Sequence, residues 1–172
     1  LQLLSEPTNA YALAATIDAL QHADLPLESA GTQQVGCVIG TSKGGVRSIY
    51  QDGITNPDLH VIAPNAAALA VQSYLGSLGP CLAPVLACAT GLASIIRGAM
   101  LIENGECDVV IAGSSDASLT PAILASFRRL GVLAEGFSLR DGSMPKKDTN
   151  AQCDNNIRGI SPQAFNRADP RY

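Results

Sequence analysis

The chain has 172 residues, of which 47% are hydrophobic and 15% charged, and its formal net charge is −4. The hydrophobic fraction excludes wholesale disorder, and the lack of any apolar run approaching about 18 residues excludes a membrane-spanning helix. The negative net charge gives no sign of the basic surface that a nucleic-acid-binding protein needs. Because soluble domains usually carry about 25% charged residues, we expect part of this surface to be covered by something else.

Helix and strand patterns alternate along the chain. In chain order they predict a helix from Ser5-Glu6-Pro7 to about His22, a buried strand at 35–40, a turn at 41–45, a helix from Pro64-Asn65 to Tyr74, a strand at 82–87, a helix from about Ala89 to Glu103, a strand at 108–113 and a helix at 121–130. This alternation is typical of an α/β fold in which a mostly parallel sheet is layered with helices.

Charge is distributed unevenly between the two ends. Residues 135–172 hold 11 of the 26 charged side chains and show no apolar periodicity. We therefore predict two parts, an α/β region over 1–134 and a polar connecting loop or tail over 135–172. The chain opens on Leu1 without an initiator methionine or a signal-peptide pattern. Both ends are interpreted as cuts in a longer chain.

The five cysteines favour a reducing compartment, because their number is odd and their spacing forms no disulfide framework. No Cys-x-x-Cys pair is present, and His22 and His60 lie 38 residues apart, so no metal site is expected. We interpret His22 as a partner of a helix C-terminus and His60 as a loop residue. Cys37, Cys81 and Cys107 are interpreted as packed small residues and Cys153 as an exposed one.

Cys88 is the strongest candidate for chemistry. It lies in Leu86-Ala87-Cys88-Ala89-Thr90-Gly91, where a strand pattern gives way to a helix pattern. A thiol at a helix N-terminus feels the positive end of the dipole, which favours the thiolate, and free backbone N–H groups there can hold an oxyanion. The small neighbours leave room for an acyl chain. The alternative, that Cys88 is only a small buried hydrophobe, stays open at this point.

A glycine repeat, a glycine-rich run and an aspartate are three further features of interest. Gly91, Gly98 and Gly105 recur every seven residues, which predicts a helix that other backbone can approach closely and that is packed on all sides. The run 40–45 resembles a phosphate loop, but it lacks the Gly-Lys-Ser/Thr ending, so a tight turn is favoured. Asp116 could cap a turn or brace a site, and the cap is favoured.

Several motifs, in order and at suitable spacings, resemble the N-terminal half of a β-ketoacyl synthase (3-oxoacyl-[acyl-carrier-protein] synthase), a member of the thiolase-like superfamily. They are Val38-Ile39-Gly40-Thr41-Ser42-Lys43-Gly44-Gly45, Pro64-Asn65-Ala66-Ala67-Ala68, Leu78-Gly79-Pro80, Ala87-Cys88-Ala89-Thr90-Gly91-Leu92, the segment 105–113, and Pro121 with Phe127. The resemblance covers about residues 9–134, and Ala164-Phe165-Asn166-Arg167 is similar to a further stretch of the family.

The resemblance implies a thiolase-like fold and a role for Cys88 as the acylated nucleophile. The thiolate would take an acyl group from a phosphopantetheine thioester on an acyl carrier protein, and a decarboxylated malonyl unit would extend it by two carbons in fatty-acid or polyketide synthesis. It further implies no bound cofactor, a cytoplasmic location, and a homodimer or a heterodimer with a synthase-like subunit.

Departures from the family pattern limit this expectation. The opening strand of the family and the second half with its histidines are missing from residues 1–172, so we expect the chain alone to be inactive in condensation. Gly113-Ser114-Ser115-Asp116 replaces the usual Gly-Gly-x-Glu. A non-catalytic synthase-like subunit, a thiolase-type acyltransferase and a purely structural α/β domain remain as alternatives.

Overall fold

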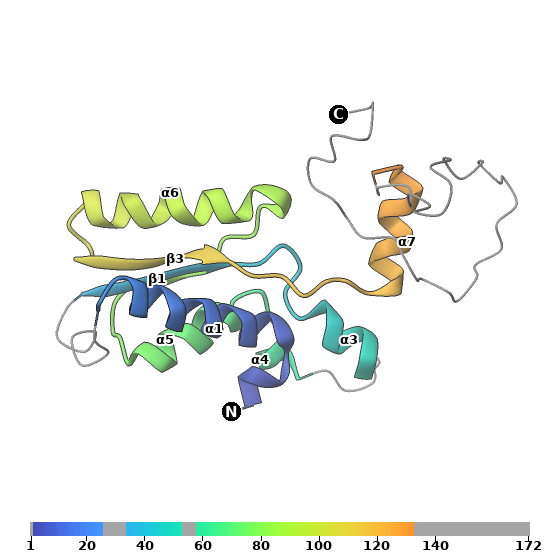
Figure 1. The fold of residues 1–172 in the computed structure, drawn as a ribbon, viewed down its shortest axis with the longest axis horizontal. Helices are drawn as coiled ribbons and strands as arrows, with labels where there is room; N and C mark the ends of the chain where they lie inside the picture. Colours follow the sequence, from blue (N-terminus) through green and yellow to red (C-terminus); the bar gives the residue numbers. More distant parts are fainter. Residues whose placement is uncertain (1, 26–33, 53–57, 133–172) are drawn as a thin grey trace, which may run out of the picture. The chain divides into compact units, whose positions relative to one another are not determined.

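A computed structural model of the chain describes residues 2–25, 34–52 and 58–132 (Figure 1). The chain divides into two units, Leu1–Thr120 and Pro121–Tyr172. Within the second unit the described structure includes helix α7 (Pro121–Leu130), as the sequence pattern predicts. The proposed tail over 135–172, including Cys153 and the motif at 164–167, lies outside the described residues.

The first unit is built around a parallel sheet with strand order β2-β1-β3. Its elements are η1 (Gln2–Ser5), α1 (Pro7–His22), β1 (Val35–Gly40), α3 (Val46–Asp52), α4 (Leu59–Ile62), α5 (Ala66–Leu75), β2 (Cys81–Leu82), η2 (Ala87–Ala89), α6 (Thr90–Glu103) and β3 (Val109–Ser114). Strand β1 pairs along its whole length with β3, from Val35 opposite Val109 to Gly40 opposite Ser114. The α/β architecture expected from the alternating pattern is confirmed.

Helices cover the central strand from both sides. Figure 1 shows α6 along one face of the sheet and α1 with α5 along the other, and α6 contacts both β1 and β3. Every residue of β1 is buried, which explains why the strand reads as a continuous apolar run rather than an alternating one. The carboxyl ends of the parallel strands then lie at one edge of the sheet, where ligand sites of α/β proteins usually form.

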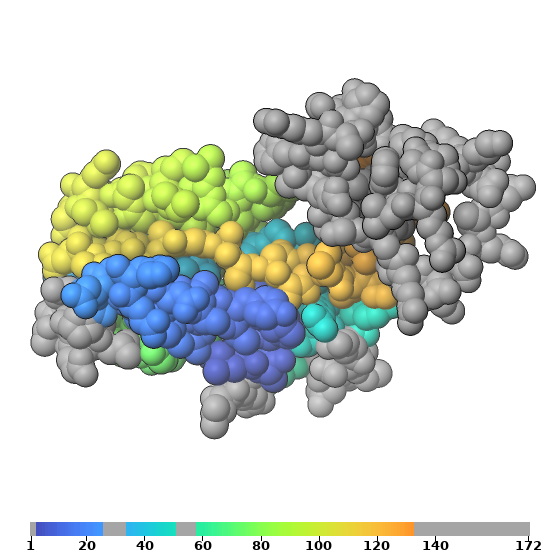
Figure 2. All heavy atoms as spheres, in the orientation of Figure 1, coloured from blue at the N-terminus to red at the C-terminus, as the bar shows by residue number. Residues whose placement is uncertain are grey.

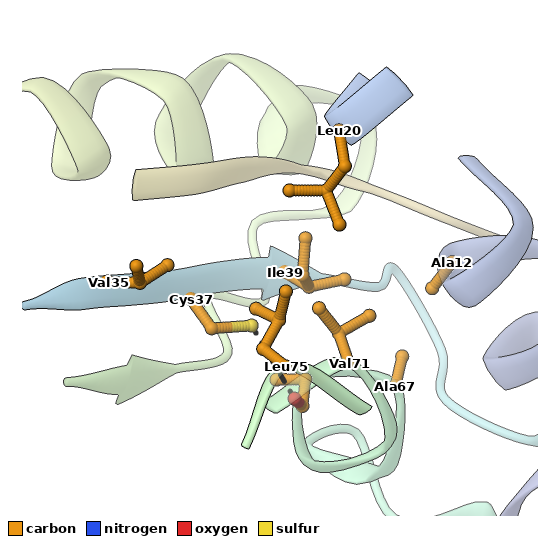
Figure 3. Close-up of a cluster of buried hydrophobic side chains, with 9 residues drawn as sticks. Ala12, Leu20, Val35, Cys37, Ile39, Ala67, Val71 and Leu75 are labelled. Atoms are coloured by element: carbon orange, nitrogen blue, oxygen red, sulfur yellow. Dashed lines mark hydrogen bonds between the residues drawn. The ribbon is translucent and has the colours of Figure 1, made fainter. Parts of the chain in front are cut away.

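The larger hydrophobic cluster fills the space between the sheet and the pair α1 and α5 (Figure 3). Its buried members are Ala12, Leu20, Val35, Cys37, Ile39, Ala67, Ala68, Val71 and Leu75. Alternate residues of β1 point to this side, and Val38 points to the smaller cluster with Leu101 and Cys107 under α6. The interpretation of Cys37 and Cys107 as packed residues is confirmed.

Small residues bring α6 very close to the sheet. A Cβ added at Gly98 would lie 3.0 Å from the Cβ of Ala112, and one added at Gly91 would lie 2.9 Å from Ser114 Oγ. The close approach predicted from these two glycines is therefore confirmed. Gly105 differs: it follows the end of α6 with φ +70°, and nothing lies within 4 Å of its added Cβ. It serves to end the helix, not to pack it.

Three details of the sequence interpretation are wrong. The strand expected at 82–87 is only Cys81–Leu82, because β2 has one partner strand and Pro84 has no N–H to donate. Helices α3 and α4 were not predicted, since each is short and lacks a long apolar period. His60 consequently lies in α4 and not in a loop.

Candidate active site

Cys88 lies in the one-turn helix η2, directly before the first residue of α6, at the carboxyl end of the sheet. Its side chain is exposed in the described structure. The interpretation of Cys88 as a small buried hydrophobe therefore does not fit, because the residue is exposed rather than packed in the core. Exposure together with a place at the start of a 14-residue helix is what a reacting thiol requires.

The turn that carries Cys88 has an unusual backbone. Ala87 has φ +50°, in the left-handed region that residues with a Cβ adopt rarely. This conformation costs about 1–3 kcal/mol and must be held by its surroundings.

Thr90 holds this turn in place. Its buried hydroxyl accepts a hydrogen bond from the Leu86 N–H at 2.9 Å and donates one to the Ala87 carbonyl oxygen at 2.8 Å. The Ala89 N–H closes the turn on the Leu86 oxygen at 3.0 Å. From the sequence, Thr90 was interpreted only as a small neighbour that leaves space. A threonine two residues after the candidate nucleophile, at a helix start, was the available signal for this bridging role.

The last residue of strand β1 packs against the same turn. A Cβ added at Gly40, the last residue of β1, would lie 2.3 Å from Thr90 Cγ2 and 2.5 Å from the Pro84 oxygen. The Ser94 hydroxyl, which is fully buried, donates to the Thr90 oxygen at 2.9 Å. A glycine at position 40 therefore lets the strand end press against the first turn of α6.

The first turn of α6 has no side-chain cap. Ala89 occupies the N-cap position and makes no side-chain hydrogen bond, whereas most helices place Ser, Thr, Asp or Asn there. The positive end of the helix dipole is consequently not offset by a capping oxygen next to Cys88. This arrangement favours the negative charge of an oxyanion formed beside Cys88.

Asp116 connects the loops that follow β1 and β3. Its Oδ1 accepts from the Ser118 N–H at 2.9 Å, as a turn cap does, and its Oδ2 accepts from the Ser42 hydroxyl. Lys43 Nζ donates to Ser42 Oγ at 2.9 Å. Desolvation alone would raise the pKa of Asp116, but the hydrogen bonds from Ser118 and Ser42 and the charge of Lys43 hold it below its usual value. The predicted cap is confirmed, and the link to Ser42 is a further role.

The glycine-rich run after β1 is a turn, as favoured from the sequence. Gly44 has φ +63° and donates its N–H to Thr41 Oγ1 at 2.7 Å, while the Gly45 N–H bonds to the Ile62 oxygen at 2.9 Å. These amides are thus occupied within the chain, and they do not form the open cradle that a phosphate needs.

The remaining candidates lie apart from this turn in the fold. His22 lies in the last turn of α1, as predicted, and His60 lies in α4; both side chains are exposed. Within residues 2–25, 34–52 and 58–132, no group of three or more His, Cys, Asp and Glu side chains could hold a metal ion. None of the helices in the same ranges has the length and apolar character needed to cross a bilayer.

The first unit is a three-layer α/β arrangement with an exposed cysteine at the turn before α6, and its fold matches solved structures. A ketosynthase bound to a hexaketide, in complex with a type II polyketide synthase acyl-carrier protein, matches with a TM-score of 0.66 and 23% identity. The match covers 78% of this chain and 40% of that chain. The fold is therefore thiolase-like.

Sequence relatives identify the family. Residues 5–143 match the β-ketoacyl synthase N-terminal domain. Nodulation protein E of Rhizobium leguminosarum bv. trifolii is 34% identical over 133 residues, which cover 72% of this chain and 33% of that protein. The mitochondrial 3-oxoacyl-[acyl-carrier-protein] synthase of Arabidopsis thaliana is 32% identical over 139 residues, 74% of this chain and 30% of that protein. The chain belongs to the β-ketoacyl synthase family, and it spans about a third of the length of these relatives.

Proposed function

We propose that this chain is the nucleophile-bearing part of a 3-oxoacyl synthase and that Cys88 is the residue that becomes acylated. The observation that carries the proposal is the exposed Cys88 thiol on the turn between Ala87, with its positive φ, and the uncapped N-terminus of α6. Family membership supports the same reaction class, since the relatives named above include a 3-oxoacyl-[acyl-carrier-protein] synthase.

The first half-reaction uses only groups of this chain. The Cys88 thiolate attacks the carbonyl carbon of an acyl thioester, and the carbonyl oxygen takes up the negative charge. The positive end of the α6 dipole stabilises that oxyanion. Collapse of the tetrahedral intermediate breaks the bond to the carrier sulfur, which leaves as a thiolate and takes a proton. The product is an acyl group held as a thioester on Cys88.

The second half-reaction requires a donor and groups beyond residues 1–172. A malonyl thioester loses carbon dioxide, and the carbanion that results attacks the acyl carbon on Cys88. The carbon–carbon bond forms as the bond to the cysteine sulfur breaks, so the thiolate returns and the chain is two carbons longer. In this proposal the histidines that assist decarboxylation lie in the second half of the synthase, and no bound cofactor takes part.

The outer face of α6 supports the existence of such a second half. Leu92, Ile95, Ile96, Met100 and Ile102 are between 42% and 64% exposed, and Figure 2 shows α6 uncovered on this side of the first unit. A run of large apolar side chains on open surface normally marks an interface. The sequence predicted a helix packed on all sides. In the structure, the side of α6 that faces β1 and β3 is packed against these strands. In the proposal the outer side is covered by the rest of the synthase.

The carrier partner and setting follow from the same family. We propose that the acyl group arrives on the phosphopantetheine of an acyl carrier protein, that the synthase acts in fatty-acid or polyketide synthesis, and that it works in the cytoplasm as a homodimer or with a synthase-like subunit. A solved ketosynthase in complex with its acyl-carrier protein supports this choice of partner.

Alkylation kinetics test the proposed role of Cys88. The chain is treated with substoichiometric iodoacetamide and the adducts are mapped by mass spectrometry. We expect Cys88 to be labelled ahead of the other four cysteines. Cys88→Ser, with Cys107→Ser as the matched control, separates loss of the reactive thiol from loss of any thiol. Labelling of Cys153 alone, with Cys88 unreactive, would contradict the proposal.

The isolated chain should not decarboxylate malonyl thioester. The groups proposed for decarboxylation are outside residues 1–172, so release of carbon dioxide from malonyl-carrier thioester should stay at the uncatalysed rate even where Cys88 is acylated. Turnover by the chain alone would show that residues of this part carry the decarboxylation, against the proposed division of work.

A further inference from the structure

We propose that Cys37 and Cys81 form a reversible disulfide between strands β1 and β2 when a peroxide oxidises the protein. The two residues are direct partners in the parallel pairing of these strands. This site is separate from Cys88, so it stands or falls independently of the proposed synthase function.

The register places the two sulfurs on the same side of the sheet. Residues directly paired in a sheet point to the same face, and neighbouring strands lie about 4.8 Å apart, within the roughly 4.4–6.8 Å between Cα atoms that disulfides span. Cys37 belongs to the core cluster beneath the sheet and Cys81 packs against that same cluster. The two thiols are near enough for each to influence the titration of the other.

The segment before β2 is tightly fixed against β1, which keeps the pair in register. The Cys37 N–H donates to the Pro80 oxygen at 2.8 Å, directly before Cys81. The Ser77 hydroxyl donates to the Val35 oxygen. A Cβ added at Gly79 would lie 2.2 Å from the Val35 oxygen, so only glycine permits this approach. A shift of one residue would break all of these contacts.

The two thiols differ in a way that suits a two-step oxidation. Cys81 is half-buried at the sheet edge, whereas Cys37 is 1% exposed and its thiol donates to the Ala68 oxygen at 3.5 Å (Figure 3). Burial raises the pKa of Cys37 to about 12 and also raises that of Cys81, where the neighbouring Cys37 thiol partly offsets the effect. Cys81 is therefore the sulfur that meets the oxidant first.

The chemistry balances with one molecule of hydrogen peroxide. The Cys81 sulfur attacks a peroxide oxygen, giving a sulfenic acid and one water. The Cys37 sulfur then attacks the Cys81 sulfur and displaces the second oxygen as water, so the two thiols lose two protons and two electrons. The disulfide would tie the edge strand β2, which leads into the turn of Cys88, covalently to the centre of the sheet.

Peptide mapping tests the proposal on the full chain. A Cys88→Ser/Cys153→Ser background removes the exposed Cys88 thiol and the one cysteine outside the described residues. The protein is treated with one equivalent of hydrogen peroxide, digested without reduction and analysed by mass spectrometry. We expect a Cys37–Cys81 linked peptide, lighter by two hydrogen atoms than the sum of its parts, that dithiothreitol returns to free thiols.

Matched variants make the result specific. Cys81→Ala should abolish the linked peptide, and Cys107→Ala, which removes a buried thiol outside the pair, should leave it unchanged. The chain with all five cysteines is analysed in parallel, so that the test does not depend on the folding of any variant. Oxidation that yields links to Cys107 or between chains, or sulfenic and sulfinic acids without a Cys37–Cys81 link, would overturn the proposal.

Discussion

Replacing Thr90 by valine tests how the turn of Cys88 is held. Valine keeps the shape and the branched Cβ of threonine but has no hydroxyl, and the two residues have similar helix propensities. The change removes the hydrogen bond from the Leu86 N–H and the one to the Ala87 oxygen, at 2.9 and 2.8 Å. Ala87 is then left at φ +50° without the two hydrogen bonds that hold this conformation.

The expected magnitude follows from these contacts. A hydrogen bond contributes about 0.5–1.5 kcal/mol net, and a buried group left without a partner costs about 1–3 kcal/mol. Two such bonds on one partly buried turn give a loss of about 2 kcal/mol in the free energy of unfolding. If that energy holds Cys88 in its reactive position, alkylation of Cys88 should slow by up to about 30-fold, since about 1.4 kcal/mol corresponds to a factor of ten.

Urea unfolding and the rate of Cys88 alkylation are the assays for this variant. Thr90→Ser is the control, because it keeps the hydroxyl and loses only the methyl group that lies against Gly40. We expect Thr90→Val to lower both stability and Cys88 reactivity, and Thr90→Ser to keep most of the reactivity. Equal stability and equal alkylation rates for Thr90→Val and the unaltered chain would refute the bridging role.

Two further changes test neighbouring features of the site. Gly40→Ala should destabilise the chain by more than about 2 kcal/mol in urea unfolding, because its Cβ would lie 2.3 Å from Thr90 Cγ2 and 2.5 Å from the Pro84 oxygen. Gly105→Ala is the control for an added methyl group, since no atom lies within 4 Å of its added Cβ. Its φ of +70° adds a smaller strain. Asp116→Asn should cost under about 1 kcal/mol at neutral pH, since the side chain is exposed. Because the folded pKa of Asp116 lies below its usual value of 3.8, its contribution to stability is present above that value and is lost as pH falls through the folded pKa. The stability difference between the two proteins, followed by unfolding between about pH 5 and pH 2, should shrink as the pH drops, and a difference that grows on acidification would contradict this assignment.

The sequence predicted the parts of the fold that depend on local pattern. The run 35–40 is apolar, β-branched and closed by glycine, and it forms the fully buried strand β1. The small-residue helix after Asn65 ends at Gly76, with φ +63°, where a glycine was expected. Cys88 could be identified as the candidate because the strand pattern gives way to a helix pattern just before Thr90, where α6 begins.

The remaining features depend on contacts between distant residues. Ser42 and Asp116 are hydrogen-bonded across 74 positions of sequence, and no local pattern reports such a pair. The length of β2 depends on how many strands flank it, which periodicity does not show. Thr90 looked like a small spacer because its bridging role exists only after Ala87 adopts its positive φ.

Acyl transfer from a carrier thioester tests the central claim most directly. The chain is mixed with an acyl-[acyl-carrier-protein] thioester, and the intact mass and the acylated peptide are measured over time for the unaltered chain and for Cys88→Ser. The account predicts one acyl group per chain, attached at Cys88, released by hydroxylamine and missing from Cys88→Ser. Acylation that persists in Cys88→Ser, or that falls on any other cysteine of the unaltered chain, would contradict it.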